Sequence, residues 1–237
     1  MPAADGDAIH GTLIQVSQLV ADIPEIHELD INPLLAGEHG VVALDARVCI
    51  EASELPGPAR LAIRPYPREL EETVTFQGRS LMLRPIRPED DPAHHALFSK
   101  LKPEDIRFRF FRAVRELPRS DYARYTQIDY DRKMTFIATR KDAQGDPETL
   151  GVVRVVADPD NASAEFAIVV RSDLKGLGLG SILMDKIIRY CRDRCTSELC
   201  GEVLAVNRAM QALARKLGFV ISTGSEEGIR SLSLELS

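Results

Sequence analysis

The sequence predicts an α+β protein in which a mixed sheet is flanked by helices and preceded by a small α/β unit. Two observations carry this prediction. From residue 80 onward the expected order is strand, helices, three strands in an antiparallel meander, helix, strand, helix and two strands. The hydrophobic pattern also changes from helical spacing to strict alternation near residue 134, with turn sequences between the alternating segments.

Length and composition bound the possible functions. The 237 residues suffice for one large domain or two small ones, and a hydrophobic content of 44% allows a buried core. The formal charge of -6 is spread along the chain and gives no overall attraction to nucleic acid or to an anionic membrane. Neither a membrane-spanning run nor a secretory signal is recognisable. We therefore expect a cytoplasmic protein with no nucleic-acid partner and no membrane partner.

Three segments are expected along the chain. Residues 1–51 contain a helical apolar stripe that includes Ile9, Leu13 and Val16, followed by two strands joined by the turn-prone residues 36–40. Residues 52–74 hold four prolines without periodicity and read as a linker. Residues 75–237 form the second domain.

The first half of that domain opens with a strand over residues 80–86. Apolar residues at helical spacing predict two short helices, broken near Pro103, and Ser120 is a suitable cap for a further helix. Alternating apolar residues then predict strands at 134–140, 150–158 and 164–170.

In the second half, an amphipathic pattern predicts a helix over residues 180–194. A strand at 199–206, a helix at 207–219 and strands around 219–223 and 231–236 complete the domain.

Three glycines, Gly176, Gly178 and Gly180, lie where a strand ends and an amphipathic helix begins. Glycine lets the backbone approach a ligand, and the helix start offers unpaired N–H groups to a phosphate. A flexible turn is the alternative. A nucleoside-triphosphate loop is excluded because Ser181 and Ile182 follow the last glycine, and the spacing also differs from the dinucleotide-binding fingerprint.

The stretch "LKGLGLGS" resembles the acetyl-CoA pyrophosphate loop of the GNAT acetyltransferase superfamily, with Lys175 where that loop usually has Gln or Arg. "NRAMQALARKLGF" is similar to the next motif of the superfamily, in which Asn207 begins a helix, and the order of elements agrees over residues 77–237. The resemblance implies a GNAT-like, mostly antiparallel sheet, acetyl-CoA as co-substrate and no metal. It implies cofactor contacts at Ala167, Ile168, Val169, Lys175, Gly176, Leu177, Gly178, Leu179, Gly180, Ser181, Asn207 and Lys216. Asn207 and Lys216 have competing roles as a helix cap and an exposed charge.

The resemblance narrows to bacterial Pat-type protein lysine acetyltransferases, through "LMLRPIRPEDDPAHHALFSKLKPEDIRFRFF", "YTQIDYDRKMTFIA" and "AEFAIVVRSDLKGLGLG". The segment "IHELDINPLLAGEHGVVALDARV" resembles the end of the ATP-grasp fold of ADP-forming acyl-CoA synthetases, in which Asp30, Asn32 and Asp45 match positions near the nucleotide-bound magnesium. About forty residues cannot enclose a nucleotide. We therefore expect a truncated ATP-grasp remnant without ATP binding or ligase chemistry, whether the chain is a truncated piece or a shortened natural form.

Glu165 stands in the apolar strand "AEFAIVV", where a charged side chain is costly to bury. A solvent-facing position at the start of the strand would explain it equally well. The resemblance assigns this position as the general base of Pat-type enzymes. A lysine amine has a reference pKa of about 10.4 and must lose a proton before it can attack a thioester. A carboxylate in apolar surroundings can accept that proton directly or through one water, which implies direct transfer without a covalent enzyme intermediate.

The cysteines, the paired histidines and one basic, aromatic stretch are best explained by structural roles. Cys191, Cys195 and Cys200 read as buried or idle thiols rather than metal ligands, and the adjacent His94 and His95 as surface or satisfied residues. In "RFRFFR", residues 107–112, single-stranded nucleic acid could stack, but helical spacing favours Phe108 and Phe111 in the core with solvated arginines.

The leading hypothesis is therefore an acetyl-CoA-dependent enzyme that acetylates lysine side chains of other proteins, with acyl-CoA synthetases as expected targets. Rival hypotheses are a small-molecule amine acetyltransferase, a CoA-sensing module that transfers nothing, and an acyl-CoA synthetase subunit. No tyrosine follows Asn207, so the residue that would protonate the CoA thiolate in many superfamily members is unassigned.

Overall fold

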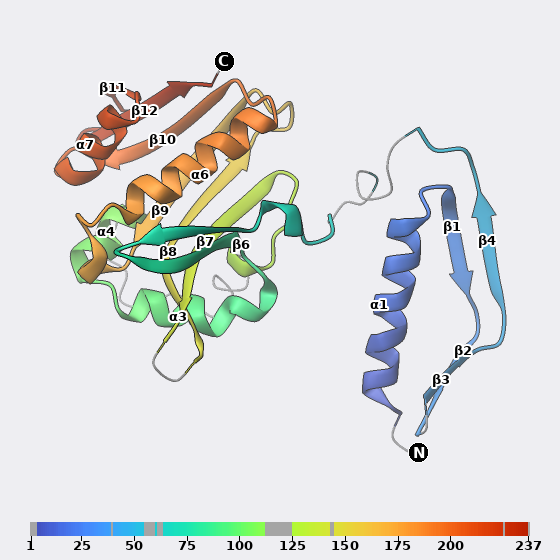
Figure 1. The fold of residues 1–237 in the computed structure, drawn as a ribbon. Helices are drawn as coiled ribbons and strands as arrows, with labels where there is room; N and C mark the ends of the chain where they lie inside the picture. The colour runs from blue at the N-terminus through green and yellow to red at the C-terminus, as the bar shows by residue number, and fades with distance from the viewer. Residues whose placement is uncertain are drawn as a thin grey trace. The chain divides into compact units, whose positions relative to one another are not determined.

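The computed structural model describes residues 4–38, 40–54, 60, 64–111, 125–142, 145–224 and 226–236. The chain divides into two compact units, Met1–Pro65 and Tyr66–Ser237. Figure 1 colours the first unit blue and the second from blue-green to red.

The first unit consists of a helix and two antiparallel ladders. They are α1 (Gly6–Asp22), β1 (Ile26–Ile31) paired with β4 (Ala46–Ile50), and β2 (Leu34–Gly37) paired with β3 (Gly40–Ala43). Asp5 caps α1, because its carboxylate accepts a hydrogen bond of 3.0 Å from the backbone N–H of Ala8. The helix and the paired strands predicted here are thus confirmed, although the strands pair as two separate ladders.

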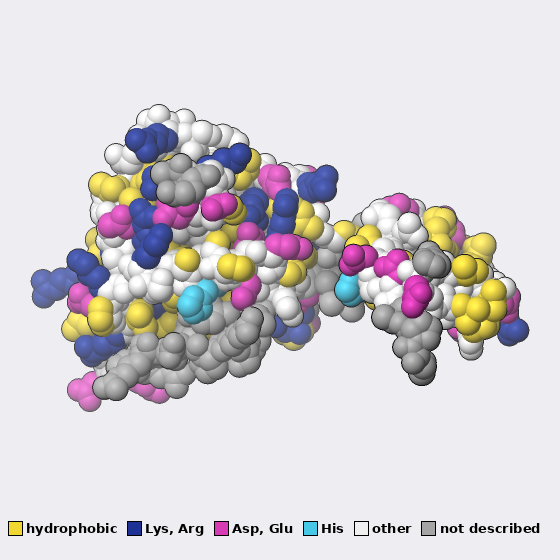
Figure 2. All heavy atoms as spheres, turned by 90° about the horizontal axis from the view of Figure 1, so that it is seen from below, with side chains coloured by type: hydrophobic (Ala, Val, Ile, Leu, Met, Phe, Trp, Pro, Cys, Tyr) yellow, Lys and Arg dark blue, Asp and Glu magenta, His cyan; other side chains and the backbone are white. Residues whose placement is uncertain are grey.

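Large apolar side chains stay exposed on this unit, and Ile26 is the only buried residue among described residues 4–54. Hydrophobic surface is visible on it in Figure 2. Side chains at least half exposed are Leu13, Ile14, Leu35, Val42, Leu44 and Ile50. The unit therefore leaves much of its apolar surface in contact with solvent.

The second unit is built on an eight-stranded sheet, counted over the described residues, with the order β11-β12-β10-β9-β8-β7-β6-β5. The strands are β5 (Glu72–Phe76), β6 (Arg79–Pro85), β7 (Lys133–Lys141), β8 (Pro147–Ala157), β9 (Ser163–Val170), β10 (Glu198–Leu204), β11 (Val220–Thr223) and β12 (Ile229–Glu235). Its neighbouring strands pair antiparallel, except for β9 and β10, which pair in parallel. The predicted mixed, mostly antiparallel sheet is confirmed.

Helices cover both faces of this sheet (Figure 1). They are α3 (Asp91–Ser99), α4 (Pro103–Phe110), α6 (Leu179–Asp193) and α7 (Arg208–Lys216), with short 3-10 segments η1 (Arg68–Leu70), η2 (Pro88–Asp90) and η3 (Ser172–Leu174). Cross-strand register puts Thr135, Arg154 and Ala167 on one face, where they line a cavity with residues of α3 and α4. On the other face the ring of Phe136 contacts Tyr190 of α6 at 5.5 Å.

The core lies between the sheet and these helices. Leu183, Met184 and Ile187 of α6 are completely buried, as its amphipathic sequence predicts. β5 was not predicted, because it begins inside the segment assigned to the linker. The start of the helix expected from Ser120 falls outside the described residues.

Gly201 of β10 makes room for the ring of Phe166. A Cβ added at this glycine would lie 2.7 Å from that ring, which is itself packed on Phe219 with centroids 5.3 Å apart. We expect Gly201→Ala to lower the free energy of unfolding by about 1–3 kcal/mol through overpacking. Urea denaturation followed by tyrosine fluorescence measures this. A second change, Phe166→Leu, should cost less in the Gly201→Ala background than alone. An unchanged midpoint for Gly201→Ala would contradict the prediction.

Candidate active site

The two parallel strands separate part-way along their length. β9 and β10 are paired at Ser163 with Glu198, at Ala164 with Leu199 and at Glu165 with Cys200. Both strands continue beyond Glu165 and Cys200 without further pairing to each other, while β9 stays paired with β8 up to Val170. The separation leaves one backbone edge of β9 open from residue 166 to 170. A cleft of about 420 Å³ lies there, lined by both strands, α4, α7 and the start of α6.

The glycine loop forms one end of this cleft. Gly176 and Gly178 have φ of +76° and +97°, and no atom lies within 4 Å of where a Cβ would stand at either position. α6 begins at Leu179, and the N–H of Ile182 bonds the carbonyl of Gly178 at 3.2 Å. The N–H groups of the three intervening residues therefore precede the first intrahelical bond and can bind an anion.

Four contacts hold the loop and the residues before it against their neighbours. Lys175 forms an ion pair with Asp105 of α4, whose side chain is only 10% exposed. The N–H of Lys102 donates to Ser172 Oγ at 2.9 Å, and that hydroxyl donates to Asp105. On the other side, Gln77 Nε2 donates to the carbonyl of Leu177 at 3.2 Å. The cradle is thus braced by α4 and by the β5–β6 turn.

The structure brings most of the predicted cofactor residues to this one cleft. Those that line it are Ala167, Ile168, Val169, Lys175, Gly176, Gly178, Gly180, Ser181, Asn207 and Lys216. Two members of the predicted set do not line it with their side chains. Leu179 is completely buried in the core, and Leu177 is 44% exposed outside the cleft lining. Helical geometry explains Leu179, since it begins the buried face of α6.

Asn207 combines two roles that the sequence could not separate. Its side chain caps α7 by accepting a hydrogen bond of 3.1 Å from the N–H of Met210, and it also lines the cleft. Lys216, at the other end of α7, is exposed. Gly180 permits α6 and α7 to approach, because a Cβ there would lie 3.2 Å from Leu213 Cδ2.

Glu165 lies at the point where the strands separate. Its side chain is exposed and lines the cleft. The apolar surroundings expected for it are therefore absent among the described residues. Glu202 of β10 and Asp105 of α4 supply the other carboxylates of the cleft wall.

The prediction for residues 107–112 was wrong about which side chains turn inward. Ile106 and Phe110 pack against the core, while Phe108 and Phe111 line the cleft. Residues 106 and 110 are four positions apart in α4, so they share its core face. Phe111 ends the helix, because its φ of 55° is left-handed. Arg109, expected in solvent, is half-buried.

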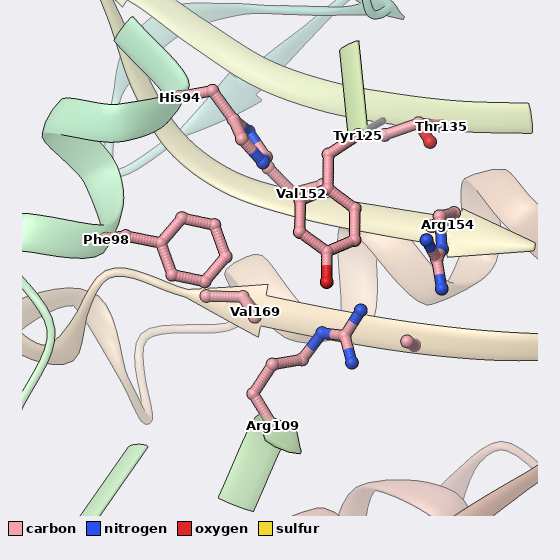
Figure 3. A pocket seen from close by; sticks show the side chains of 9 residues that line it. His94, Phe98, Arg109, Tyr125, Thr135, Val152, Arg154 and Val169 are labelled. Carbon is pink, nitrogen blue, oxygen red and sulfur yellow. The ribbon is translucent and has the colours of Figure 1, made fainter. Parts of the chain in front are cut away.

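A smaller cavity of about 20 Å³ lies beside the cleft, between α3 and the face of the sheet that carries Ala167 (Figure 3). His94 of α3 borders it and is 2% exposed, with its ring 5.1 Å from that of Phe98. Burial lowers the pKa of His94 to about 4, with Arg109 and Arg154 acting in the same direction against Asp91 and Asp90. His94 is therefore a buried, neutral residue, and His95 beside it is exposed.

This depressed pKa predicts a pH-dependent stability. Between about pH 6.5 and pH 4 the unfolded chain binds a proton at residue 94 that the folded chain does not. The free energy of unfolding should therefore fall by about 1.4 kcal/mol per pH unit as the pH drops through this range. His94→Gln should remove that slope and the matched His95→Gln should keep it. All five tyrosines lie at or after residue 66 and the chain has no tryptophan, so tyrosine fluorescence reports on the second unit alone. Equal slopes in wild type and His94→Gln would contradict the prediction.

Comparison with known proteins decides the family. The model of the acetyltransferase (GNAT) family matches residues 102–219. Acetyltransferase PA5475 of Pseudomonas aeruginosa is 31% identical over 143 residues, which cover 60% of this chain and 76% of that protein. The chain belongs to the GNAT acetyltransferase family. It is accordingly an acetyl-CoA-dependent N-acyltransferase.

Two further matches extend over more of this GNAT enzyme. Acetyltransferase Pat of Mycolicibacterium smegmatis is 28% identical over 246 residues, covering 92% of the chain and 72% of the relative. The crystal structure of the GNAT domain of S. lividans PAT superposes with a TM-score of 0.65 at 24% identity, covering 72% of the chain and 99% of that domain. The latter shows the shared fold.

The first unit of the GNAT enzyme matches a different family. Residues 1–50 match an ATP-grasp domain model. The β subunit of acetate–CoA ligase [ADP-forming] I from Pyrococcus furiosus is 39% identical over 44 residues, which are 19% of each chain. The unit is therefore similar to a short part of that fold. Among the described residues, no helix is long and apolar enough to span a membrane, and no cluster of three or more His, Cys, Asp or Glu side chains is arranged to hold a metal ion.

The cleft of the GNAT enzyme fits acetyl-CoA. Open space lies over Gly176 and Gly178, and a side chain at either position would enter it. This space faces the free N–H groups at the start of α6 and suits a pyrophosphate. The open edge of β9 offers backbone groups to the amides of the pantetheine arm, as to an added strand. Acetyl-CoA supplies the acetyl thioester when it is bound.

Proposed function

We propose that this enzyme transfers the acetyl group of acetyl-CoA to lysine side chains of other proteins in the cytoplasm, with Glu165 as the general base. The observation that carries the proposal is the position of Glu165. It is the last residue of β9 paired with β10, so its carboxylate lies where the cleft begins. An acceptor amine that approached a thioester lying along β9 would meet this carboxylate.

The exposure of Glu165 determines how it acts. An acceptor lysine arrives as an ammonium ion and must lose a proton before its nitrogen can attack. Glu165, which is open to solvent, accepts this proton directly or through one water molecule. The nitrogen then bonds to the acetyl carbon as the carbon–sulfur bond breaks and CoA leaves as a thiolate, and the second proton that the nitrogen loses passes through solvent to that thiolate.

Direct transfer is supported by the protonation of Cys200, the cysteine paired with Glu165 across the two strands. Cys200 lies across from Glu165 in the register of the two strands. Burial and the charge of Glu165 raise the pKa of the Cys200 thiol. A thiol that holds its proton is a poor nucleophile, so a covalent acetyl-cysteine step is disfavoured.

A protein acceptor is supported by similarity to acetyltransferase Pat of M. smegmatis over 92% of the chain. Acyl-CoA synthetases are the targets we propose, since acetylation of an active-site lysine removes a charge on which such an enzyme depends. We also propose three functional segments, 1–51 as an ATP-grasp remnant, 52–74 as a linker and 75–237 as the catalytic domain.

The proposal is tested by supplying acetyl-CoA together with a purified AMP-forming acetyl-CoA synthetase, with a panel of small amines, or with no acceptor. Release of free CoA thiol and mass-spectrometric detection of acetyl-lysine are measured in parallel. Acetyl-lysine formed on the synthetase supports the proposal. Turnover of small amines alone indicates a small-molecule acetyltransferase, and acetyl-CoA binding without any turnover indicates a CoA-sensing module.

A further inference from the structure

Two arginines share the small cavity beside Glu165. Arg109 reaches it from α4 and Arg154 from β8, and Figure 3 shows the Arg109 guanidinium directed toward Tyr125 with Arg154 to the side of that ring. The Arg154 guanidinium lies 5.3 Å from the centre of that ring. Arg109 also lines the main cleft, so the pair joins the cavity to the site where transfer is proposed.

Neither guanidinium forms a hydrogen bond or an ion pair with a carboxylate among the described residues. Other arginines of the second unit do, for example Arg84 with Asp90 at 2.6 Å and Arg171 with Glu148 at 2.5 Å. Arg109 and Arg154 are both half-buried. Buried charges are normally paired, because an unpaired one loses its hydration without compensation.

The two cations also act on each other. Burial lowers the pKa of Arg109, and the nearby charge of Arg154 lowers it further. Tyr125 and the charge of Glu165 act in the opposite direction and offset only part of this effect, since the pKa of Arg109 stays lowered. Glu165 offers its charge to the acceptor amine, and a negative group on the acceptor would complement the two guanidinium groups that it leaves only partly offset.

We propose that Arg109 and Arg154 form a subsite for a carboxylate carried by the acceptor next to its reactive amine. The inference rests on the proposed lysine transfer and names a property of its substrate. A guanidinium recognises a carboxylate through two parallel N–H donors, which fits a pair of arginines at one cavity. A volume of about 20 Å³ accommodates one oxygen-sized group, so the rest of the acceptor would extend into the main cleft.

The carboxylate can be the α-carboxylate of the acceptor lysine itself or the side chain of a neighbouring acidic residue. Matched pairs of acceptors distinguish the two sources. Nα-acetyl-lysine is compared with Nα-acetyl-lysine amide, which lacks only the α-carboxylate. Nα-acetyl-Glu-Lys amide is compared with Nα-acetyl-Gln-Lys amide, which lacks only the acidic side chain. We expect kcat/KM to favour the carboxylate member of at least one pair by about tenfold or more, as charge-assisted hydrogen bonds allow. A preference in the first pair points to small amino-acid acceptors, and one in the second to acidic peptide segments.

Variants of the full chain test which residues cause the preference. Arg109→Gln and Arg154→Gln should each bring the ratio toward one, and Arg109→Lys should keep part of it because charge remains without the planar fork. The matched control is Arg107→Gln, an exposed arginine of α4 outside both cavities, which should keep the wild-type ratio. A wild-type ratio near one in both pairs, or a ratio unchanged by both glutamine variants, overturns the subsite.

The subsite and the proposed function can fail separately. Dissociation constants of the same four acceptors are measured by NMR titration in the presence of CoA, with no chemistry required. If neither the purified synthetase nor any of these four acceptors is acetylated, the proposed function fails. The ratio of dissociation constants still decides the subsite, which is upheld if the carboxylate members bind about tenfold more tightly and overturned if they do not.

Discussion

Glu165→Gln is expected to lower kcat/KM for acetyl transfer to lysine by about a hundredfold or more while leaving acetyl-CoA affinity unchanged. General base catalysis is typically worth 10²–10⁴-fold, and the amide side chain cannot accept the proton. The change conserves size at an exposed position, so folding should be unaffected. Steady-state rates of CoA thiol release and calorimetric titration with CoA measure the two quantities.

The pH profile distinguishes a base from a residue that merely positions the acceptor. Without a base, the rate depends on the fraction of acceptor lysine that is already neutral, which rises about tenfold per pH unit below its pKa of about 10.4. The deficit of Glu165→Gln should therefore shrink as the pH rises from 7 to 9. A constant deficit over that range would assign Glu165 another role.

A second carboxylate of the same cleft provides the control. Glu202 lies on β10 in the cleft wall, on the strand opposite Glu165. Glu202→Gln removes an equal charge at a position that follows the separation of the strands, so its loss should be much smaller. Equal losses in both variants would indicate that the charge of the cleft matters and that neither residue is the base.

The sequence was sufficient for the elements that rest on local patterns. Alternation identified β7, β8 and β9, and helical spacing together with Pro103 divided α3 from α4. β5 was missed because five residues beside a proline-rich segment carry too little periodicity. Its pairing with β6 is a tertiary contact that no local pattern predicts.

The candidate site was predictable in part, for the same reason. The glycine loop, Glu165 and Asn207 are contiguous with motifs, whereas Asp105 and Gln77 reach the loop from 70 or more residues away. Arg154 offered a usable signal, a charge inside the apolar strand "LGVVRVVAD", which is the argument that selected Glu165. The separation of β9 from β10 had no sequence signal, since it depends on which strands pair and on the number of residues over which they pair.

Gly178→Val is expected to weaken acetyl-CoA binding by at least about tenfold. Gly178 is the residue before α6, with φ of +97°, a conformation that costs a β-branched residue of order 1–3 kcal/mol. The strain would turn the N–H groups at the start of α6 away from the pyrophosphate, and the new side chain would occupy the open space over the loop. Calorimetric titration with CoA measures the loss.

Gly228→Val separates this effect from strain alone. Gly228 has a similar φ of +85° and equally open surroundings, but it is exposed before β12 and does not line the cleft. Both variants should lower the melting temperature by comparable amounts, because both impose a β-branched residue on a left-handed backbone. Only Gly178→Val should also weaken CoA binding. Equal CoA affinity in the two variants would mean that Gly178 is needed for the turn and that its open surroundings do not hold the cofactor.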